Sequence, residues 1–335
     1  MNTTHDEQDE HPDVTWRVSS GTAAVLGLRA LRMDAAPTTA YLMLGERCQR
    51  NCAFCAQART SSAHQAALSR VIWPQFAAQQ TAAAIAEAYA HGDIQRACFQ
   101  VTSCAGHLAQ TREAVACLAS QADVPICVSV LAHTVQEVGE LLEAGAQRVT
   151  LALDAATPEI YALTKHGDWE RAVELLEACA RAYPRHIGTH LIVGLGESEH
   201  DMALTIQRLT DLGITIGLFA FTPVAGTEYA TRPAPPIDQY RRIQAMLWLC
   251  VHGHVHTDQM AFDAQGRIVD YGLPRSRLCA LLQDGEAFRT PGCPGCNRPY
   301  YTERPGGTMY NYPRPLTPQE ATQALSLVLG DNRII

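Results

Sequence analysis

Short apolar runs alternate along the chain with longer stretches in which apolar and polar residues follow a helical period. The short runs are β-like and predict strands near residues 40–44, 96–102, 125–130, 147–153, 187–193, 214–221 and 254–262. The longer Ala- and Leu-rich stretches predict amphipathic helices near 75–91, 110–120, 134–144, 168–182, 199–212 and 237–251. Such alternation indicates parallel strands joined by helical crossovers.

The repeat of about 25–40 residues per strand–helix unit suits an α/β fold of the (β/α) barrel type, full or partly open, with a doubly wound sheet as the alternative. After about residue 272 the chain is rich in Pro, Gly, Tyr and Arg, which favours a loop-rich module ending in a helix near 317–329. We therefore expect a disordered tail at 1–14, a barrel at 15–272 and a C-terminal module at 273–335.

The composition of the chain excludes several classes of function. The chain has 335 residues, 47% of them hydrophobic, and a formal net charge of −8, so it offers no basic field for nucleic acid. It has no apolar run of about 18 residues that would span a membrane, and its acidic N-terminus lacks the pattern of a secretory signal. These features predict a cytoplasmic protein. In a reducing compartment its twelve cysteines indicate metal or cluster binding rather than disulfides.

Three of the cysteines follow the first predicted barrel strand. Cys48, Cys52 and Cys55 form a CxxxCxxC motif directly after the apolar run that ends at Leu44 and Gly45. Three thiolates from one loop can hold three irons of a [4Fe–4S] cluster and leave the fourth iron open. Structural zinc is the alternative, but it usually takes four ligands. Loops after barrel strands lie at the face where active sites form.

The motif, with Phe54 as its aromatic residue, resembles that of the radical S-adenosylmethionine (SAM) superfamily. The resemblance implies a [4Fe–4S] cluster whose open iron binds SAM, and an electron donor such as ferredoxin or flavodoxin. It also implies that Cys48, Cys52 and Cys55 are the catalytic ligands. One electron then splits a C–S bond of SAM and yields a 5′-deoxyadenosyl radical, because acid–base chemistry cannot open an unactivated C–H bond.

Three further segments, VTLALDAATPEIY (149–161), THLIVGLGESEHD (189–201) and GLFAFTPVAGTEY (217–229), resemble biotin synthase. This resemblance implies that Asp154 contacts the ribose of SAM. It places the region of Ile192, Gly194 and Glu197 near the adenine, and makes Lys165, or the adjacent His166, the counterpart of a basic residue that holds the methionyl carboxylate.

The second cluster of biotin synthase, its sulfur source, is not matched in full. Cys98 and Cys127 fall where two of its cysteines are expected, but the third position is Gly188 and the arginine ligand has no clear match. A pocket asparagine is replaced by Ala152. Cys98 and Cys127 are therefore either remnants of such a site or plain buried thiols.

A second trio of cysteines, Cys279, Cys293 and Cys296, lies in the C-terminal segment. It predicts either a second [4Fe–4S] cluster or a zinc knuckle that lacks an evident fourth ligand, Cys250 being the nearest candidate. With the segment CPGCNRPYYTERP it resembles the two-component, archaeal-type lipoyl synthases. That resemblance implies a sulfurtransferase that inserts sulfur from the auxiliary cluster into a protein-bound octanoyl chain, with an octanoylated lipoyl-carrier domain and a second radical SAM subunit as partners.

Two other hypotheses about the function of the chain stay open. The chain is either a biotin synthase-like radical enzyme for another substrate, with a structural zinc or cluster tail, or a non-catalytic cluster-binding partner subunit. Two groups of residues also have alternative readings. The alternating His252, His254 and His256 would face one side of a strand, as a metal site or as packing. The C-terminal Arg and Tyr residues would form a docking face for an acidic carrier or pack within the module; these are Arg298, Arg304, Arg314, Tyr300, Tyr301, Tyr310 and Tyr312.

Overall fold

The structure is a computed structural model that describes residues 14–304 and 306–330. The expected disordered tail, residues 1–14, lies outside the described residues except for its last one, Val14. No helix in the described ranges is long and apolar enough to cross a membrane.

The central sheet has eight strands in the order β10-β9-β8-β7-β6-β2-β1-β5. Six of them run parallel and follow one another in chain order: β2 (Thr39–Leu44), β6 (Arg96–Val101), β7 (Ile126–Ser129), β8 (Arg148–Thr150), β9 (Ile187–Val193) and β10 (Thr215–Ala220). Their order never reverses, which excludes the doubly wound alternative. Among the described strands β10 pairs only with β9. The predicted barrel is therefore confirmed in its partly open form.

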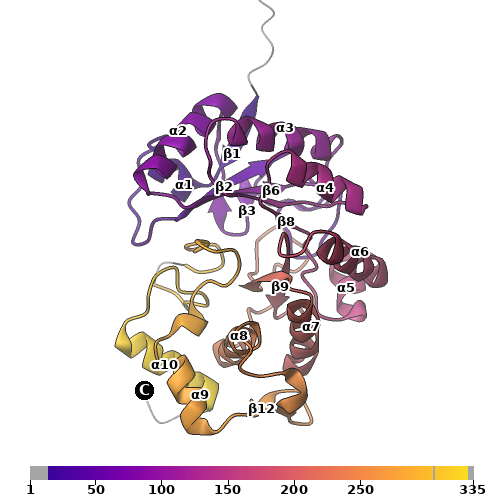
Figure 1. Cartoon of the computed structure of the whole chain (residues 1–335), viewed down its shortest axis with the longest axis vertical. Helices are drawn as coiled ribbons and strands as arrows, with labels where there is room; N and C mark the ends of the chain where they lie inside the picture. Colours follow the sequence, from indigo (N-terminus) through magenta and orange to yellow (C-terminus); the bar gives the residue numbers. More distant parts are fainter. Residues whose placement is uncertain (1–13, 305, 331–335) are drawn as a thin grey trace, which may run out of the picture.

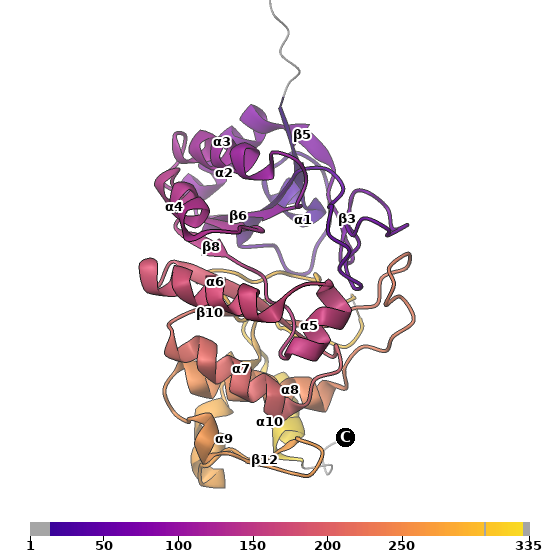
Figure 2. The ribbon, with the colours of Figure 1, turned by 90° about the vertical axis from the view of Figure 1, so that its right-hand side faces the viewer.

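Helices cover the outer side of the curved sheet (Figures 1 and 2). They are α2 (Ala78–His91), α3 (His107–Ala119), α4 (Val135–Glu143), α6 (Trp169–Ala182), α7 (Glu199–Asp211) and α8 (Ile237–Val251). Capping residues fix where they begin: the side chain of Thr134 caps α4 and that of Ser198 caps α7, each in a capping box. A short helix that the sequence pattern did not predict, α5 (Pro158–Lys165), begins after its N-cap Thr157.

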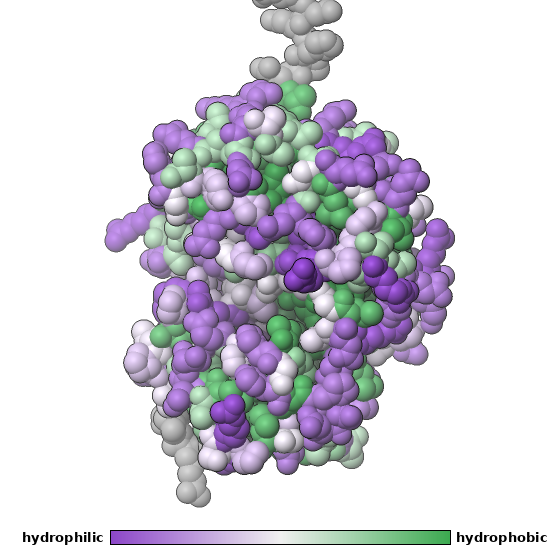
Figure 3. All heavy atoms as spheres, viewed as in Figure 1, coloured by the Kyte–Doolittle hydropathy of each residue, from purple (hydrophilic) through white to green (hydrophobic). Residues whose placement is uncertain are grey.

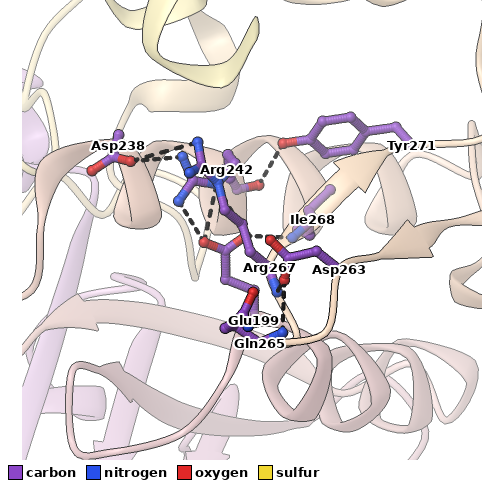
Figure 4. Close-up of polar contacts among 8 residues, drawn as sticks. All are labelled: Glu199, Asp238, Arg242, Asp263, Gln265, Arg267, Ile268 and Tyr271. Atoms are coloured by element: carbon purple, nitrogen blue, oxygen red, sulfur yellow. Dashed lines mark hydrogen bonds and ion pairs between the residues drawn. The ribbon is translucent and has the colours of Figure 1, made fainter. Parts of the chain in front are cut away.

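A buried ion-pair cluster joins the last two barrel helices (Figure 4). The guanidinium of Arg242 on α8 lies 2.6 Å from Glu199 at the start of α7 and 2.8 Å from Asp238. Glu199 also accepts a hydrogen bond of 2.8 Å from the backbone N–H of Ile268. Because each buried charge has a partner, the cluster holds the two helices in one arrangement.

The expected seventh strand at 254–262 is wrong. This stretch contains a 3₁₀ turn, η1 (Thr257–Gln259), and only the short strand β11 (Ala261–Phe262), which pairs with β12 (Ile268–Asp270). Its backbone is held by polar side chains instead of a sheet, as in the hydrogen bond from the Thr257 N–H to the Gln207 side chain. The three histidines do not share a strand face: His252 stacks on Trp248 at 4.2 Å.

An N-terminal addition extends the sheet beyond the predicted barrel. Strand β1 (Thr15–Val18) pairs antiparallel with both β2 and β5 (Gln75–Ala77). It buries Trp16, whose ring meets Phe99 edge-on at 5.2 Å, and α1 (Ser20–Val25) follows. A small hairpin of β3 (Ala67–Leu68) and β4 (Val71–Ile72) lies in the loop between β2 and β5.

The C-terminal segment contains α9 (Arg275–Leu282), η2 (Glu286–Phe288) and α10 (Pro318–Leu329), the last close to the predicted bounds. Between η2 and α10 runs a long loop, residues 289–316, which we call the C-terminal loop. It contacts the first and the last of the six parallel strands, since Arg298 bonds through its N–H to the Tyr41 hydroxyl on β2 and through its guanidinium to the Leu218 carbonyl on β10. The C-terminal loop therefore connects these two strands of the open barrel.

On the face drawn in Figure 3, polar and apolar residues of the described chain are interspersed. The main apolar core instead lies between the sheet and its helices, where residues such as Leu42, Phe99, Val128 and Leu191 are fully buried. With the apolar core on the outer side of the sheet, the strand ends and the barrel interior are left for chemistry.

Candidate functional site

The loop with the CxxxCxxC motif leaves β2 at Gly45. This residue has a φ of +84°, and a Cβ here would come within 2.5 Å of the Thr102 hydroxyl. Only glycine fits this turn without strain. Beyond it the loop is held by its own backbone, with hydrogen bonds of 3.1 Å from the Cys48 N–H to the Gln57 carbonyl and 3.0 Å from the Cys55 N–H to the Cys52 carbonyl.

The three cysteines of this loop are free thiols, each partly buried. Burial raises the pKa of Cys52, and it raises the pKa of the Cys55 thiol to about 12. In the described ranges no three His, Cys, Asp or Glu side chains converge on a single metal ion. A cluster has different needs, because each thiolate binds a separate iron. Three free thiols on one ordered loop therefore fit a cluster better than structural zinc.

Asp154 and Lys165 form a buried ion pair next to this loop. Their side chains lie 2.7 Å apart, and the Lys165 ammonium also donates to the Ala152 carbonyl. Burial alone would lower the pKa of Lys165, but the Asp154 carboxylate and other nearby groups outweigh it and raise that pKa. Asp154 has a φ of +67°, in the left-handed region, where it forms a bridge to Leu191 on β9. Lys165 is the one lysine in the sequence, and this feature alone could have singled it out as a candidate site residue.

The predicted adenine-contacting region is a tight turn after β9. The carboxylate of Glu197 accepts hydrogen bonds from the backbone N–H groups of Gly194, at 2.6 Å, and Leu195, at 3.0 Å. Glu197 is buried, and burial raises its pKa despite these bonds. A Cβ on Gly194 would lie 3.0 Å from Pro235. Glu197 therefore shapes this turn from within and does not present its carboxylate to a ligand.

A cavity of about 170 Å³ runs through the barrel interior. Its lining includes Phe54 and Cys55 of the cysteine loop, together with the predicted SAM contacts Asp154 and Ile192. Its walls are largely apolar and aromatic, with Leu68, Trp73, Phe219, Phe221, Val224 and Tyr301 among them. Cys48, Cys52 and Lys165 line a neighbouring cavity of about 350 Å³. The cysteine loop thus lies between two cavities.

The lining of the barrel cavity also includes four further cysteines from three parts of the chain. Cys98 on β6 and Cys127 on β7 are direct neighbours in the sheet register. Cys293 and Cys296 come from the C-terminal loop, and the Sγ atoms of Cys127 and Cys293 lie 3.3 Å apart. The hydrogen bond from Cys127 lowers the pKa of the Cys293 thiol to about 6. The third cysteine of the predicted C-terminal trio, Cys279, lies on α9 and is not part of this cavity wall.

The position that corresponds to the third biotin synthase cysteine has no room for one. A Cβ on Gly188 would lie 2.9 Å from the Thr150 hydroxyl and 3.2 Å from the Thr215 carbonyl. The C-terminal loop fills the interior nearby, where the Arg298 guanidinium lies 4.0 Å from the Phe219 ring centre. Other members of the suggested docking face also pack inward, since Tyr312 is buried and Tyr310 bonds to the Pro235 carbonyl.

The pattern of the Radical SAM superfamily matches residues 42–209, which include the cysteine loop, the Asp154 region and the Glu197 turn. No curated protein matches this chain. Among solved structures, one of HydG, a maturase of the [FeFe]-hydrogenase, aligns with a TM-score of 0.53 and 13% identity over 65% of this chain and 51% of that one. Methylornithine synthase (PylB) aligns with a TM-score of 0.51 and 11% identity over 70% and 66%.

A second structure of HydG, from Carboxydothermus hydrogenoformans, is 17% identical over 64% of this chain and 52% of that one, with a TM-score of 0.49. The chain therefore spans about half the length of the HydG structures that it resembles. At these identities the likeness concerns the fold alone.

Proposed function

Because the chain belongs to the Radical SAM superfamily, we propose that it is a sulfur-inserting enzyme, one component of a lipoyl synthase. Membership implies a [4Fe–4S] cluster and SAM, which supply an adenosyl radical when bound. We propose Cys48, Cys52 and Cys55 as the ligands of this cluster and an auxiliary [4Fe–4S] cluster as the sulfur source. The substrate would be the octanoyl chain of a lipoyl-carrier domain. At each carbon one C–H bond would break and its hydrogen atom would leave in 5′-deoxyadenosine, with one SAM and one electron from the donor consumed. The new C–S bond would take sulfide from the auxiliary cluster, and the electron released in this step would remain on the iron of that cluster.

One observation supports this proposal above the others: the same cavity is lined by Phe54 and Cys55 of the radical-forming loop and by four further thiols. The loop follows the C-terminal end of β2, whereas Cys98 and Cys127 lie in the first halves of β6 and β7. A carbon chain in this cavity would lie near both groups. Sulfur insertion needs this arrangement, since hydrogen removal and sulfur delivery must reach the same carbon. The apolar wall, with Leu68 and Phe221, suits an alkyl chain.

The remaining residues of the site would bind and orient SAM. We propose that Lys165 holds the methionyl carboxylate and that Asp154 binds the ribose hydroxyls. In the structure the two side chains satisfy each other at 2.7 Å. Both charges are thus held in place before the ligand arrives, which limits the entropy lost on binding. Phe54, Ile192 and the Gly194–Glu197 turn would form the surface that receives the nucleoside.

The proposed partners are the octanoylated carrier domain, a second radical SAM subunit and an electron donor such as ferredoxin or flavodoxin. Two radical enzymes are invoked because two carbons of the octanoyl chain receive sulfur.

The decisive experiment is anaerobic turnover. The full chain, reconstituted with iron and sulfide, is reduced in the presence of SAM, octanoylated carrier and the partner subunit. We expect 5′-deoxyadenosine and a thiolated carrier by mass spectrometry. The Cys48→Ala/Cys52→Ala/Cys55→Ala variant should form neither.

Formation of 5′-deoxyadenosine without a thiolated carrier would contradict sulfur insertion and support a biotin synthase-like enzyme for another substrate. Absence of 5′-deoxyadenosine in the wild type would favour a non-catalytic subunit.

A further inference from the structure

We propose that Cys98, Cys127, Cys293 and Cys296 together hold the auxiliary iron–sulfur cluster, and that Cys279 is not a ligand. This inference rests on the proposed function, which requires a second cluster, and it gives that cluster a location. The site would be shared between the barrel and the C-terminal loop.

The first support is the pairing of the four thiols. Cys98 and Cys127 are opposite each other on adjacent parallel strands, so their side chains leave the same face of the sheet. Cys293 and Cys296 are joined by a turn in which the Cys296 N–H bonds to the Cys293 carbonyl at 3.0 Å. All four line the barrel cavity. Two pairs of cysteines, one from each side, thus meet there.

The second support is how firmly the C-terminal loop is fixed in this place. The side chain of buried Asn297 accepts from the Thr38 N–H at 3.0 Å and donates to the Ala36 carbonyl at 2.8 Å. The Thr38 hydroxyl donates to the Gly295 carbonyl at 2.7 Å. The turn with the two cysteines is therefore fastened to the start of β2, and its position against Cys98 and Cys127 is set by the fold.

The third support is the polar environment of the thiols. Arg96, only 4% exposed, donates to the Cys127 sulfur at 2.9 Å and to the Pro294 carbonyl at 3.0 Å. Gln100 donates to the Cys98 sulfur at 3.1 Å, and the Tyr41 hydroxyl lies 3.4 Å from the Cys296 sulfur. A buried guanidinium and several donors aimed at sulfur would stabilise an anionic cluster held by these four residues.

Zinc is the main alternative for four cysteines. Four thiolates around zinc must converge, each about 2.3 Å from the ion. In the described part of the chain no three such side chains converge in this way. The thiols also open into the same cavity as the radical-forming loop, whereas a structural zinc site needs no substrate cavity. The shared cavity therefore favours a cluster, and binding one would move the Cys127 and Cys293 sulfur atoms, which lie 3.3 Å apart, away from each other onto separate irons.

Cys279 shares neither the location nor the cavity of the four proposed ligands. It lies in α9, is absent from the cavity wall, and belongs to the predicted trio only through its place in the sequence. It therefore offers a matched control for the ligand set.

The test counts iron, acid-labile sulfide and zinc in the full chain after anaerobic reconstitution with iron and sulfide. The Cys48→Ala/Cys52→Ala/Cys55→Ala background removes the first site, so that the remaining metal reports the second. We expect about four irons and about four sulfides per chain, as one [4Fe–4S] cluster requires. Adding Cys98→Ala/Cys127→Ala should abolish both, whereas adding Cys279→Ala should leave them unchanged.

A second variant, Cys293→Ser/Cys296→Ser in the same background, replaces the other two proposed ligands and should also lose the iron and the sulfide. Circular dichroism should show that all variants keep the secondary structure of the parent, which excludes misfolding as the cause of the loss. Iron retained without Cys98 and Cys127, iron lost with Cys279, or zinc in place of iron and sulfide would overturn the assignment. So would a disulfide between Cys127 and Cys293 in the reconstituted chain. The count needs no carrier, so a chain that passes this test but forms no thiolated product contradicts only the proposed function.

Discussion

The Asp154–Lys165 ion pair beside the cavity and His190 in the cavity wall show what single residues contribute to stability. Lys165 and Asp154 are charged, almost fully buried, and paired at 2.7 Å. The pair is consistent with SAM-binding roles for both, but it also bears on stability, because each charge compensates the other. His190 lines the cavity itself, and burial lowers its pKa from the ordinary value to about 4.

Replacing Lys165 by Met should destabilise the fold. Removing one partner of a buried pair leaves Asp154 uncompensated and lowers the unfolding free energy by about 3–5 kcal/mol. Adding Asp154→Asn should recover part of this loss, since no isolated charge then remains. Denaturant unfolding under anaerobic conditions measures both. Equal stability of wild type and Lys165→Met would show that the pair does not form.

His190 should make stability depend on pH. The unfolded chain takes up a proton as the pH falls through about 6.5, whereas folded His190 stays neutral until a pH of about 4. Stability from this residue is therefore full above pH 6.5 and is lost progressively down to pH 4. His190→Gln cannot be protonated, so the variant should lose less unfolding free energy than the wild type between pH 7.5 and 5. Parallel losses in the two proteins would contradict the shifted pKa.

At the scale of elements, regular periodicity was informative and short or loop-borne structure was not. The six parallel strands and their helices follow from apolar runs and helical period. Strand β1 was missed because four residues, TWRV, carry too little pattern. The stretch 254–262 was assigned to a strand wrongly, since a contact that shapes it comes from Gln207, which is 50 residues away from Thr257 in the sequence.

The two candidate cysteine sites also differ in how far they could be predicted from the sequence. The Cys48–Cys52–Cys55 group is local, so its spacing shows in the sequence. The second group of thiols joins Cys98 and Cys127 to cysteines that lie about 170–200 residues later. No periodic pattern reveals the path of the C-terminal loop, which depends on single side chains such as Asn297. The resemblance to biotin synthase pointed to Cys98 and Cys127, but not to their partners.

Asn297→Ala tests whether the C-terminal loop acts as a fixed element. The change leaves the Thr38 N–H and the Ala36 carbonyl without partners, which should cost about 1–3 kcal/mol. We expect iron bound at the second site to fall while the first site keeps its own. Gln323→Ala on the exposed face of α10 is the control and should change neither. Equal iron in the two variants would mean that Asn297 does not position the cysteines.

For the whole molecule, the two ends of the chain complete an open barrel. The N-terminal strand extends the sheet beyond β2, and Arg298 of the C-terminal loop contacts both β2 and β10. The cavity is lined by residues from β2, from the middle strands and from the C-terminal loop.

We propose that sulfur from the cluster held by Cys98, Cys127, Cys293 and Cys296 enters the octanoyl chain. To measure this, the chain is reconstituted with sulfide that carries a heavy sulfur isotope, free sulfide is removed, and the carrier is analysed by mass spectrometry after a single anaerobic turnover. We expect heavy sulfur in the thiolated octanoyl group, and no such product from the Cys98→Ala/Cys127→Ala variant. A thiolated product of ordinary isotopic composition would show that the sulfur has another source.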